Sequence, residues 1–221
     1  YYVRLVDLDS NTISPIAGNN VNADSGDGNI AINASIASPR GVAYDAIGNL
    51  YIATEAGSVR VVDTSGRIST LVGAAGSVVG DDMPARGARL NLPRGMVVDN
   101  VRGYLYIAEE GANRIRRVDL ATQRITTVVG DGLPGAEGDG GPALFAHLRA
   151  PTFVGLDENG NLLIADAGNN KIRRVVFGAA QGGLLVYGAA ARDLSKIERG
   201  ADGTFDQAST DVAHHRHYRL Y

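Results

Sequence analysis

The stretch Pro93-Arg-Gly-Met-Val-Val-Asp99, followed by Gly103-Tyr-Leu-Tyr-Ile-Ala108, decides the fold because it occurs in three copies. The other copies are Pro39-Arg-Gly-Val-Ala-Tyr-Asp45 with Gly48-Asn-Leu-Tyr-Ile-Ala53, and Pro151-Thr-Phe-Val-Gly-Leu-Asp157 with Gly160-Asn-Leu-Leu-Ile-Ala165. They recur at a period of about 56 residues, which indicates a repeat architecture. Each half is a short run rich in Val, Ile, Leu and Tyr between turn residues, which predicts two β-strands joined by a tight turn.

Two further strand-like runs follow each copy and complete a four-stranded unit. The third run lies at 59–63, 115–119 and 172–176, and the fourth at 68–73, 125–130 and 184–188. The N-terminus supplies this pair alone, at 3–7 and 13–18. Four short antiparallel strands per unit describe a β-propeller blade, so we predict an all-β fold with about 14 strands, or about three and a half blades.

The connections between units also repeat. Segments 26–39, 80–93 and 138–151 have the same length, begin with Gly-Asp and end with Pro. Ala at their sixth and ninth positions and Ile or Leu at the eleventh predict a short helical turn. We expect Asp27, Asp81 and Asp139 to cap this turn; the alternative is a calcium site, because calcium prefers several oxygen ligands.

These motifs resemble NHL-repeat β-propellers, in particular the long-loop type with a Gly-Asp-Gly-Gly-Pro-Ala segment, here at 138–143. The resemblance covers residues 1–188, and the segment 189–221 is expected to be a non-repeat tail or linker. This sequence departs from the NHL pattern at Asp81-Asp-Met and at Val176. NHL propellers commonly have six blades, so the resemblance implies a partial propeller. We expect further blades from the same or another chain, or a protein partner, to cover the open blade faces.

Composition narrows the function classes. The net charge is −3, from 21 Lys and Arg against 24 Asp and Glu, which disfavours a general nucleic-acid binder. There is no cysteine, so disulfides and thiolate metal sites are excluded. No apolar run reaches the length of a membrane span. Tyr1 begins the chain without a signal segment, from which we expect a processed product or a piece of a longer protein.

Asp45, Asp99 and Asp157 end the first strand of each unit and are the candidate metal ligands. Functionally, they would ring an opening and bind a cation such as calcium. The simpler interpretation is that each accepts backbone hydrogen bonds within its own turn, as Asp does in Asx-turns. No cofactor is otherwise expected.

A row of arginines recurs on the third strands and is the candidate interaction surface: Arg60, Arg116, Arg117, Arg173 and Arg174, with Arg4 on the N-terminal pair. Such a row suits phosphate or RNA, as in some NHL propellers. The simpler interpretation is a set of solvated arginines, because nearby Glu and Asp residues offset their charge.

Two further signals lie outside the strands. Asn33-Ala-Ser35 fits the glycosylation acceptor pattern, which applies in a secreted protein. His214, His215 and His217 could bind zinc or nickel, but in a tail we favour an incidental cluster; His147 is expected to be a surface side chain.

The sequence supports three candidate functions. The first is a non-catalytic binding or structural module for protein or carbohydrate in a larger extracellular assembly, which the repeat and the resemblance both favour. The second is a propeller enzyme of the lyase or lactonase type with a carboxylate-bound metal. The third is RNA binding through the arginine row.

Overall fold

The computed structural model describes residues 1–73, 80–177, 184–190, 197–199, 205–207 and 217–218. Within them, the strands form five antiparallel sheets. The N-terminal hairpin consists of β1 (Val3–Asp7) and β2 (Thr12–Ala17). The first sheet contains β3 (Pro39–Tyr44), β4 (Leu50–Thr54), β5 (Val59–Val62) and β6 (Ile68–Val72).

Two more sheets repeat this order. The second sheet contains β7 (Met83–Pro84), β8 (Pro93–Asp99), β9 (Tyr104–Glu109), β10 (Arg114–Asp119) and β11 (Arg124–Val129). The third sheet contains β12 (Pro151–Leu156), β13 (Leu162–Asp166), β14 (Lys171–Phe177) and β15 (Leu184–Ala190). A separate small sheet contains β16 (Ile197–Arg199), β17 (Phe205–Gln207) and β18 (His217–Tyr218).

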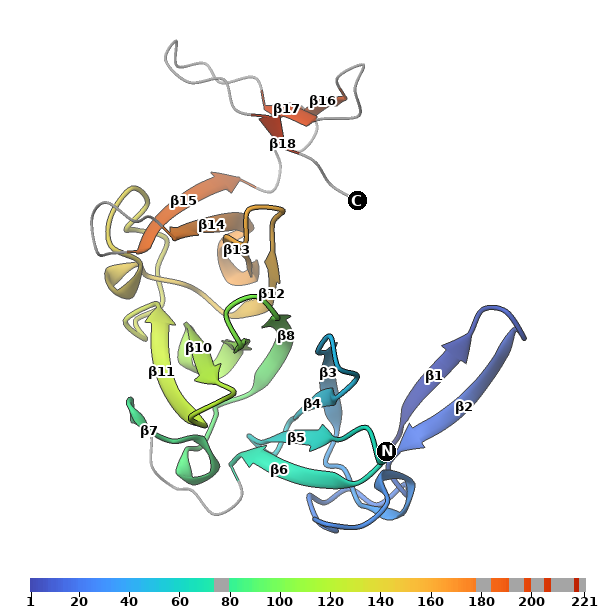
Figure 1. Ribbon diagram of the computed structural model, residues 1–221. Coiled ribbons are helices and arrows are strands. Elements are labelled where there is room, and N and C mark those ends of the chain that lie inside the picture. The colour runs from blue at the N-terminus through green and yellow to red at the C-terminus, as the bar shows by residue number, and fades with distance from the viewer. Residues whose placement is uncertain (74–79, 178–183, 191–196, 200–204, 208–216, 219–221) are drawn as a thin grey trace.

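Each sheet is antiparallel, and apart from β7 its strands pair with their neighbours along the chain. The predicted all-β fold of propeller-type sheets is therefore confirmed. Figure 1 shows the N-terminal hairpin and the three sheets following one another along an arc, with β3, β8 and β12 on its inner side. Strand β7 was not predicted: it pairs with the start of β11 and adds a fifth strand at the outer edge of the second sheet.

The inner strands approach closely because two of them carry glycine at equivalent positions. A Cβ on Gly95 would lie 2.5 Å from Cδ2 and 2.8 Å from Cα of Phe153 on β12. A Cβ on Gly41 would collide with the carbonyl oxygen of Arg94 on β8. Only a residue without a side chain allows these backbones to lie this near to each other.

The connections pack between neighbouring sheets, on the side away from the inner strands. Each contains a 3-10 turn, at η1 (Ala31–Asn33), η2 (Ala85–Gly87) and η4 (Ala143–Phe145), as the alanine spacing predicts. The expected Asp cap is wrong. Ile30, Pro84 and Pro142 occupy the cap positions, and no side chain caps the turn. Two other short turns, η3 (Glu110–Ala112) and η5 (Ala167–Asn169), join second to third strands.

The apolar core is divided among the spaces between sheets. One cluster joins Leu71 and Val72 of β6 to Leu105 and Ile107 of β9, with Leu90 of the connection between them. A second cluster joins β11 to β13 in the same way, and a third joins the N-terminal hairpin to β4 and β6. Each sheet therefore hides its apolar face only by lying against the next. No helix in the described part is both long and apolar enough to cross a bilayer.

Candidate interaction site

The arginine row is largely inside the protein, which corrects the expectation of an exposed surface. Arg60, Arg116 and Arg173 have no exposed surface at all and are among the largest fully buried side chains. Arg117 is half-buried, with its guanidinium 4.5 Å from the ring centre of Tyr104. Arg174 is also half-buried. The strands alternate, so the first arginine of each Arg-Arg pair points inward and the second points away.

Each buried arginine is clamped by the aspartate of the connection that leads into its own sheet. Arg60 lies 2.7 Å from Asp27, Arg116 lies 3.1 Å from Asp81, and Arg173 lies 2.6 Å from Asp139. The guanidinium groups also donate to carbonyl groups of these connections, namely those of Ser25, Ser35, Gly80, Glu137 and His147. The Gly-Asp segment thus secures the connection to the sheet instead of capping its helical turn.

The clamp aspartates also hold the fourth strand. Asp27 accepts hydrogen bonds from the backbone N–H and the hydroxyl of Thr70, and Asp81 accepts the same pair from Thr127. Burial pushes the pKa of Asp27 upward, but the bonds from Thr70 and the charge of Arg60 outweigh it and leave the pKa below its ordinary value. Asp27 also binds Arg86 of the next connection at 3.1 Å, so neighbouring connections are linked.

A second carboxylate faces each buried arginine from the opposite side. It comes from the end of the second strand in two sheets: Glu109 lies 3.6 Å from Arg116, and Asp166 lies 3.4 Å from Arg173. Both carboxylates are fully buried, and each accepts the backbone N–H two residues before the proline that starts the sheet. One side chain therefore neutralises the arginine and fixes the end of the connection.

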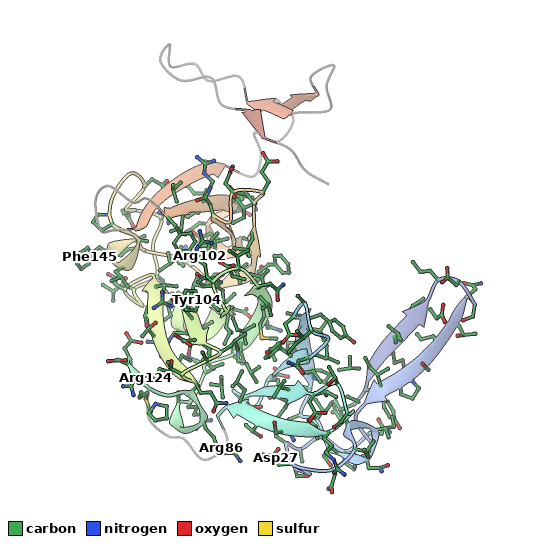
Figure 2. All side chains as sticks on the ribbon, in the orientation of Figure 1. Asp27, Arg86, Arg102, Tyr104, Arg124 and Phe145 are labelled. Carbon is green, nitrogen blue, oxygen red and sulfur yellow. The ribbon has the colours of Figure 1, made fainter. Side chains whose placement is uncertain are left out.

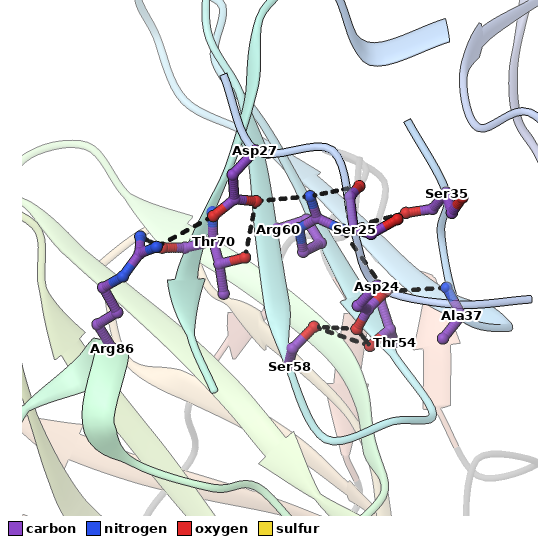
Figure 3. A network of polar contacts seen from close by, with 10 residues as sticks. All are labelled: Asp24, Ser25, Asp27, Ser35, Ala37, Thr54, Ser58, Arg60, Thr70 and Arg86. Atoms are coloured by element: carbon purple, nitrogen blue, oxygen red, sulfur yellow. Dashed lines mark hydrogen bonds and ion pairs between the residues drawn. The ribbon is translucent and has the colours of Figure 1, made fainter. Parts of the chain in front are cut away.

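The first sheet has Thr54 where the others have a carboxylate, and Asp24 takes over both tasks (Figure 3). Asp24 lies 3.7 Å from Arg60 and accepts the backbone N–H of Ala37, two residues before Pro39. Its other oxygen accepts hydrogen bonds from the hydroxyl groups of Thr54 at 2.7 Å and Ser58 at 2.6 Å. The same charge arrangement is thus built from a different part of the chain.

The candidate metal ligands lie at the opposite end of the sheets, each engaged in its own turn. Asp45 accepts the N–H groups of Ile47 and Asn49, and Asp99 accepts those of Val101 and Arg102. Asp157 accepts those of Asn159 and Asn161. Burial raises the pKa of Asp45, but the hydrogen bonds from Asn49 outweigh it, so the pKa is lowered overall. Across the described ranges, no three His, Asp or Glu side chains form a group that could hold a metal ion.

The second and third sheets are joined by stacked charged and aromatic groups. Arg102 donates to the carbonyl oxygen of Gly160 and lies 4.8 Å from the ring centre of Phe177. Figure 2 shows Arg102 and Tyr104 where these sheets meet, whereas Asp27, Arg86, Arg124 and Phe145 lie along the outer rim of the arc. Burial, followed by the charge of Asp99, raises the pKa of Tyr106 in this interface to about 12.

The N-terminal hairpin exposes the apolar face that the other sheets hide. Val6 and Ile13 face each other across β1 and β2 and are 52% and 60% exposed. The equivalent cross-strand pairs, Val62 with Ile68 and Val118 with Ile125, are buried. Leu5 is also exposed, as are Val42 and Tyr44 on β3. We define the face formed by Arg4, Val6 and Ile13, together with the outer edge of β1, as the open hairpin face.

Comparison with known proteins agrees with this repeat pattern. A profile of the teneurin NHL domain matches residues 18–80, which contain the first sheet and the connection before it. That part of the chain is similar to an NHL domain. The fold also matches a solved structure of catalytically inactive virginiamycin B lyase from Staphylococcus aureus with quinupristin. The TM-score is 0.52 and the identity 14%, over 99% of this chain and 63% of that one, so this likeness concerns the fold alone.

Three curated proteins are similar in sequence to part of the chain. Teneurin-1 of Caenorhabditis elegans is 27% identical over 114 residues, which are 48% of this chain and 4% of the relative. Protein SUPPRESSOR OF QUENCHING 1, chloroplastic, of Arabidopsis thaliana is 28% identical over 151 residues, which are 64% of this chain and 14% of the relative. A probable peptidyl-alpha-hydroxyglycine alpha-amidating lyase of C. elegans is 28% identical over 102 residues, which are 46% of this chain and 27% of the relative. The chain thus spans less than a third of each relative.

The remaining predicted site residues are Asn33, His147 and the histidines near the C-terminus. Asn33 is exposed at the end of η1. His147 is half-buried, and its two ring nitrogens each lie 3.1 Å from a carboxylate, of Asp131 and of Glu137. His214 and His215 lie outside the described residues, and His217 is described only as part of β18.

Sequence reasoning missed the pairing of each buried arginine with its aspartate, although the signal was present in every unit. Every connection begins with Gly-Asp, and each run predicted as the third strand of a unit, at 59–63, 115–119 and 172–176, has Arg at its second position. Two opposite charges that recur together in each unit indicate a pair within that unit. The role of Asp24 had no such signal, because it occurs in one unit only.

Proposed function

We propose that the chain is a non-catalytic structural module whose open sheet faces are covered by protein, either further blades of the same or another chain or a separate protein partner. The observation that carries this proposal is the exposure of Val6 and Ile13 on the open hairpin face, at positions that are buried in the other sheets. An exposed apolar face beside an unpaired strand edge is typical of a protein interaction site.

The polar groups support the same function, because many of them hold the frame together. Arg60, Arg116 and Arg173 are clamped inside the sheets and have no surface to offer to RNA. Asp45, Asp99 and Asp157 accept the N–H groups of their own turns. The result is a rigid series of sheets with an exposed end, which suits assembly.

Location and partner identity belong to this proposal as well. An extracellular location fits the acceptor pattern at Asn33, while the relatives include both a teneurin and a chloroplastic protein. A protein partner is preferred to a carbohydrate because the open hairpin face is apolar and ends in an unpaired β-strand edge.

Sedimentation velocity over a series of protein concentrations tests the proposal. We expect the chain to associate as concentration rises, through the open hairpin face, and Ile13→Asp to shift it towards the monomer. Val101→Asp is the matched control, since Val101 is 95% exposed in a turn away from that face. A chain that stays monomeric throughout, or an Ile13→Asp variant that associates like the control, would overturn the proposal.

A further inference from the structure

Three hydrogen-bond donors lie in one cross-strand row of the second sheet. Tyr106 of β9 pairs in register with Arg117 of β10, which pairs with Thr126 of β11. Residues that are directly opposite in a sheet point to the same face, and Tyr106 belongs to the apolar cluster that joins β11 to β13. These three residues, which we call the donor row, therefore face the third sheet.

The donor row contains three buried polar atoms that have no protein partner. They are the hydroxyl oxygens of Tyr106 and Thr126 and the Nε atom of Arg117, and none of them forms a hydrogen bond with a described residue. Tyr106 has no exposed surface at all. A buried donor without an acceptor is unfavourable, so unpartnered donors that gather in one row point to a bound acceptor.

The first sheet shows why the hydroxyl of Tyr106 has no partner. Tyr51 is at the equivalent position there, and it donates its hydroxyl to the Asp45 carboxylate at 3.0 Å. In the second sheet both oxygens of the equivalent Asp99 are occupied. One accepts N–H groups of its own turn, and the other accepts the guanidinium of Arg102 at 2.7 Å. Arg102 thus takes the place that a tyrosine hydroxyl has in the first sheet.

Arg117 gives the donor row a positive charge that the first sheet lacks, since Val61 is at the equivalent position there. Its guanidinium lies 4.5 Å from the ring centre of Tyr104. Among the described residues, no carboxylate lies within ion-pair distance of it. Asp119, two residues further along β10, accepts the N–H groups of its own turn. The charge of Arg117 therefore has no direct counterion in the described part of the chain.

Aromatic rings flank the donor row. The ring centre of Tyr106 lies 6.2 Å from that of Tyr104 and 6.1 Å from that of Phe177 on the third sheet. Figure 2 shows Tyr104 where these two sheets meet. The Tyr106 hydroxyl, whose pKa is raised to about 12 by burial and then by the charge of Asp99, keeps its proton at neutral pH and can donate it. Attraction between charges is stronger in such surroundings than in water.

We propose that the donor row binds a small monovalent anion, with chloride as the test ion. All three groups can donate, and the nearby carboxylate of Asp99 is occupied, so the bound species has to accept hydrogen bonds. A single negative charge matches the guanidinium of Arg117, which a water molecule would leave unbalanced. Burial of the donor atoms favours an ion of few atoms. The inference is independent of the proposed function, because the donor row lies between two sheets and not on an open face.

Chloride binding by the full chain is tested with variants that remove one hydroxyl and keep the shape of the side chain. Tyr106→Phe and Thr126→Val change the donor row, and Tyr51→Phe is the matched control, because the Tyr51 hydroxyl already has Asp45 as its partner. Broadening of the chloride NMR line measures the affinity. Thermal unfolding in sodium chloride and in sodium gluconate, both at about 0.1 M so that screening is equal, measures the effect on stability.

We expect Tyr106→Phe and Thr126→Val each to weaken chloride binding about tenfold, since a hydrogen bond to a charged group has roughly this effect. Replacing gluconate by chloride should raise the unfolding midpoint about 2–4 °C more in the unmodified chain than in Tyr106→Phe, and Tyr51→Phe should keep the full increase. Absence of chloride line broadening overturns the inference and leaves water as the occupant. Equal affinity of Tyr106→Phe and the unmodified chain also overturns it, because the ion then binds elsewhere.

Discussion

The guanidinium of Arg60 lies 2.7 Å from the carboxylate of Asp27, which is 33 positions earlier in the chain. The same pairing recurs at Arg116 and Arg173, and it ties each connection to the sheet that follows it. The free energy of a buried pair depends on desolvation as well as attraction, and the Nε atom of each of these arginines has no hydrogen-bond partner within the described residues.

Removing one buried charge from this arrangement tests its contribution. Glu109→Gln leaves Arg116 and Arg114 without their shared carboxylate in a fully buried place. We expect the free energy of unfolding to fall by about 3 kcal/mol, the usual cost of breaking a buried ion pair, with Asp81 as the remaining carboxylate beside Arg116. Denaturant unfolding measures it. The control, Asp82→Asn, breaks the exposed Arg124 pair and should cost under about 1 kcal/mol; equal effects would contradict the assignment.

The exchange of roles between Thr54 and Asp24 can be tested by restoring the common pattern. Asp24→Asn should destabilise the chain by about 1–3 kcal/mol, since Arg60, Thr54 and Ser58 all depend on that carboxylate. Adding Thr54→Glu places a carboxylate where β9 has Glu109 and should recover part of the loss. A double-mutant cycle measures the coupling, and strictly additive effects would argue against a shared site.

Close packing of the inner strands predicts a strong effect at Gly95. Gly95→Ala should destabilise the chain by about 1–3 kcal/mol, because the new methyl group overlaps Phe153. Gly155→Ala is the matched control on β12, where the added Cβ would meet Phe153 at 3.5 Å, an ordinary contact. Thermal unfolding compares the two, and a neutral Gly95→Ala would mean that the inner strands are further apart.

The aspartates at both ends of the sheets predict acid sensitivity. The folded-state pKa values of Asp27 and Asp45 are lowered, so their stabilising contribution is complete above the unfolded-state value of about 4 and is lost as pH falls through the folded-state pKa. The midpoint of unfolding should therefore not change with pH near neutrality, and it should fall as the solution becomes acidic. Asp27→Asn should show a shallower acid decline than the unmodified chain; an identical profile would exclude this cause.

Calcium titration separates the two interpretations of Asp99. Because its oxygens accept bonds from Val101 and Arg102, we expect the unfolding midpoint to be the same with calcium and with chelator. Asp99→Asn should lower it equally in both conditions. A calcium-dependent rise that Asp99→Asn abolishes would instead assign ion binding to this turn.

The sequence predicts the sheets well because period, turn residues and apolar runs all report local structure. Strand pairing of Leu105 and Val118, for example, follows from the repeat alone. The direction of a side chain relative to the next sheet is not local. Arg60 was therefore expected in solvent although it is buried, and Asp27 was expected at a helix cap although it forms an ion pair. The open hairpin face was implied only by the missing strands of the first unit.

The position of the apolar clusters between sheets, and not within them, has a consequence for cooperativity. Each sheet shares its stabilising contacts with nearest neighbours, so unfolding should propagate along the array like a one-dimensional chain of coupled units. The second sheet, with a four-stranded sheet on either side, should exchange its amide hydrogens most slowly. Covering the N-terminal hairpin would then raise protection far beyond the residues that are touched.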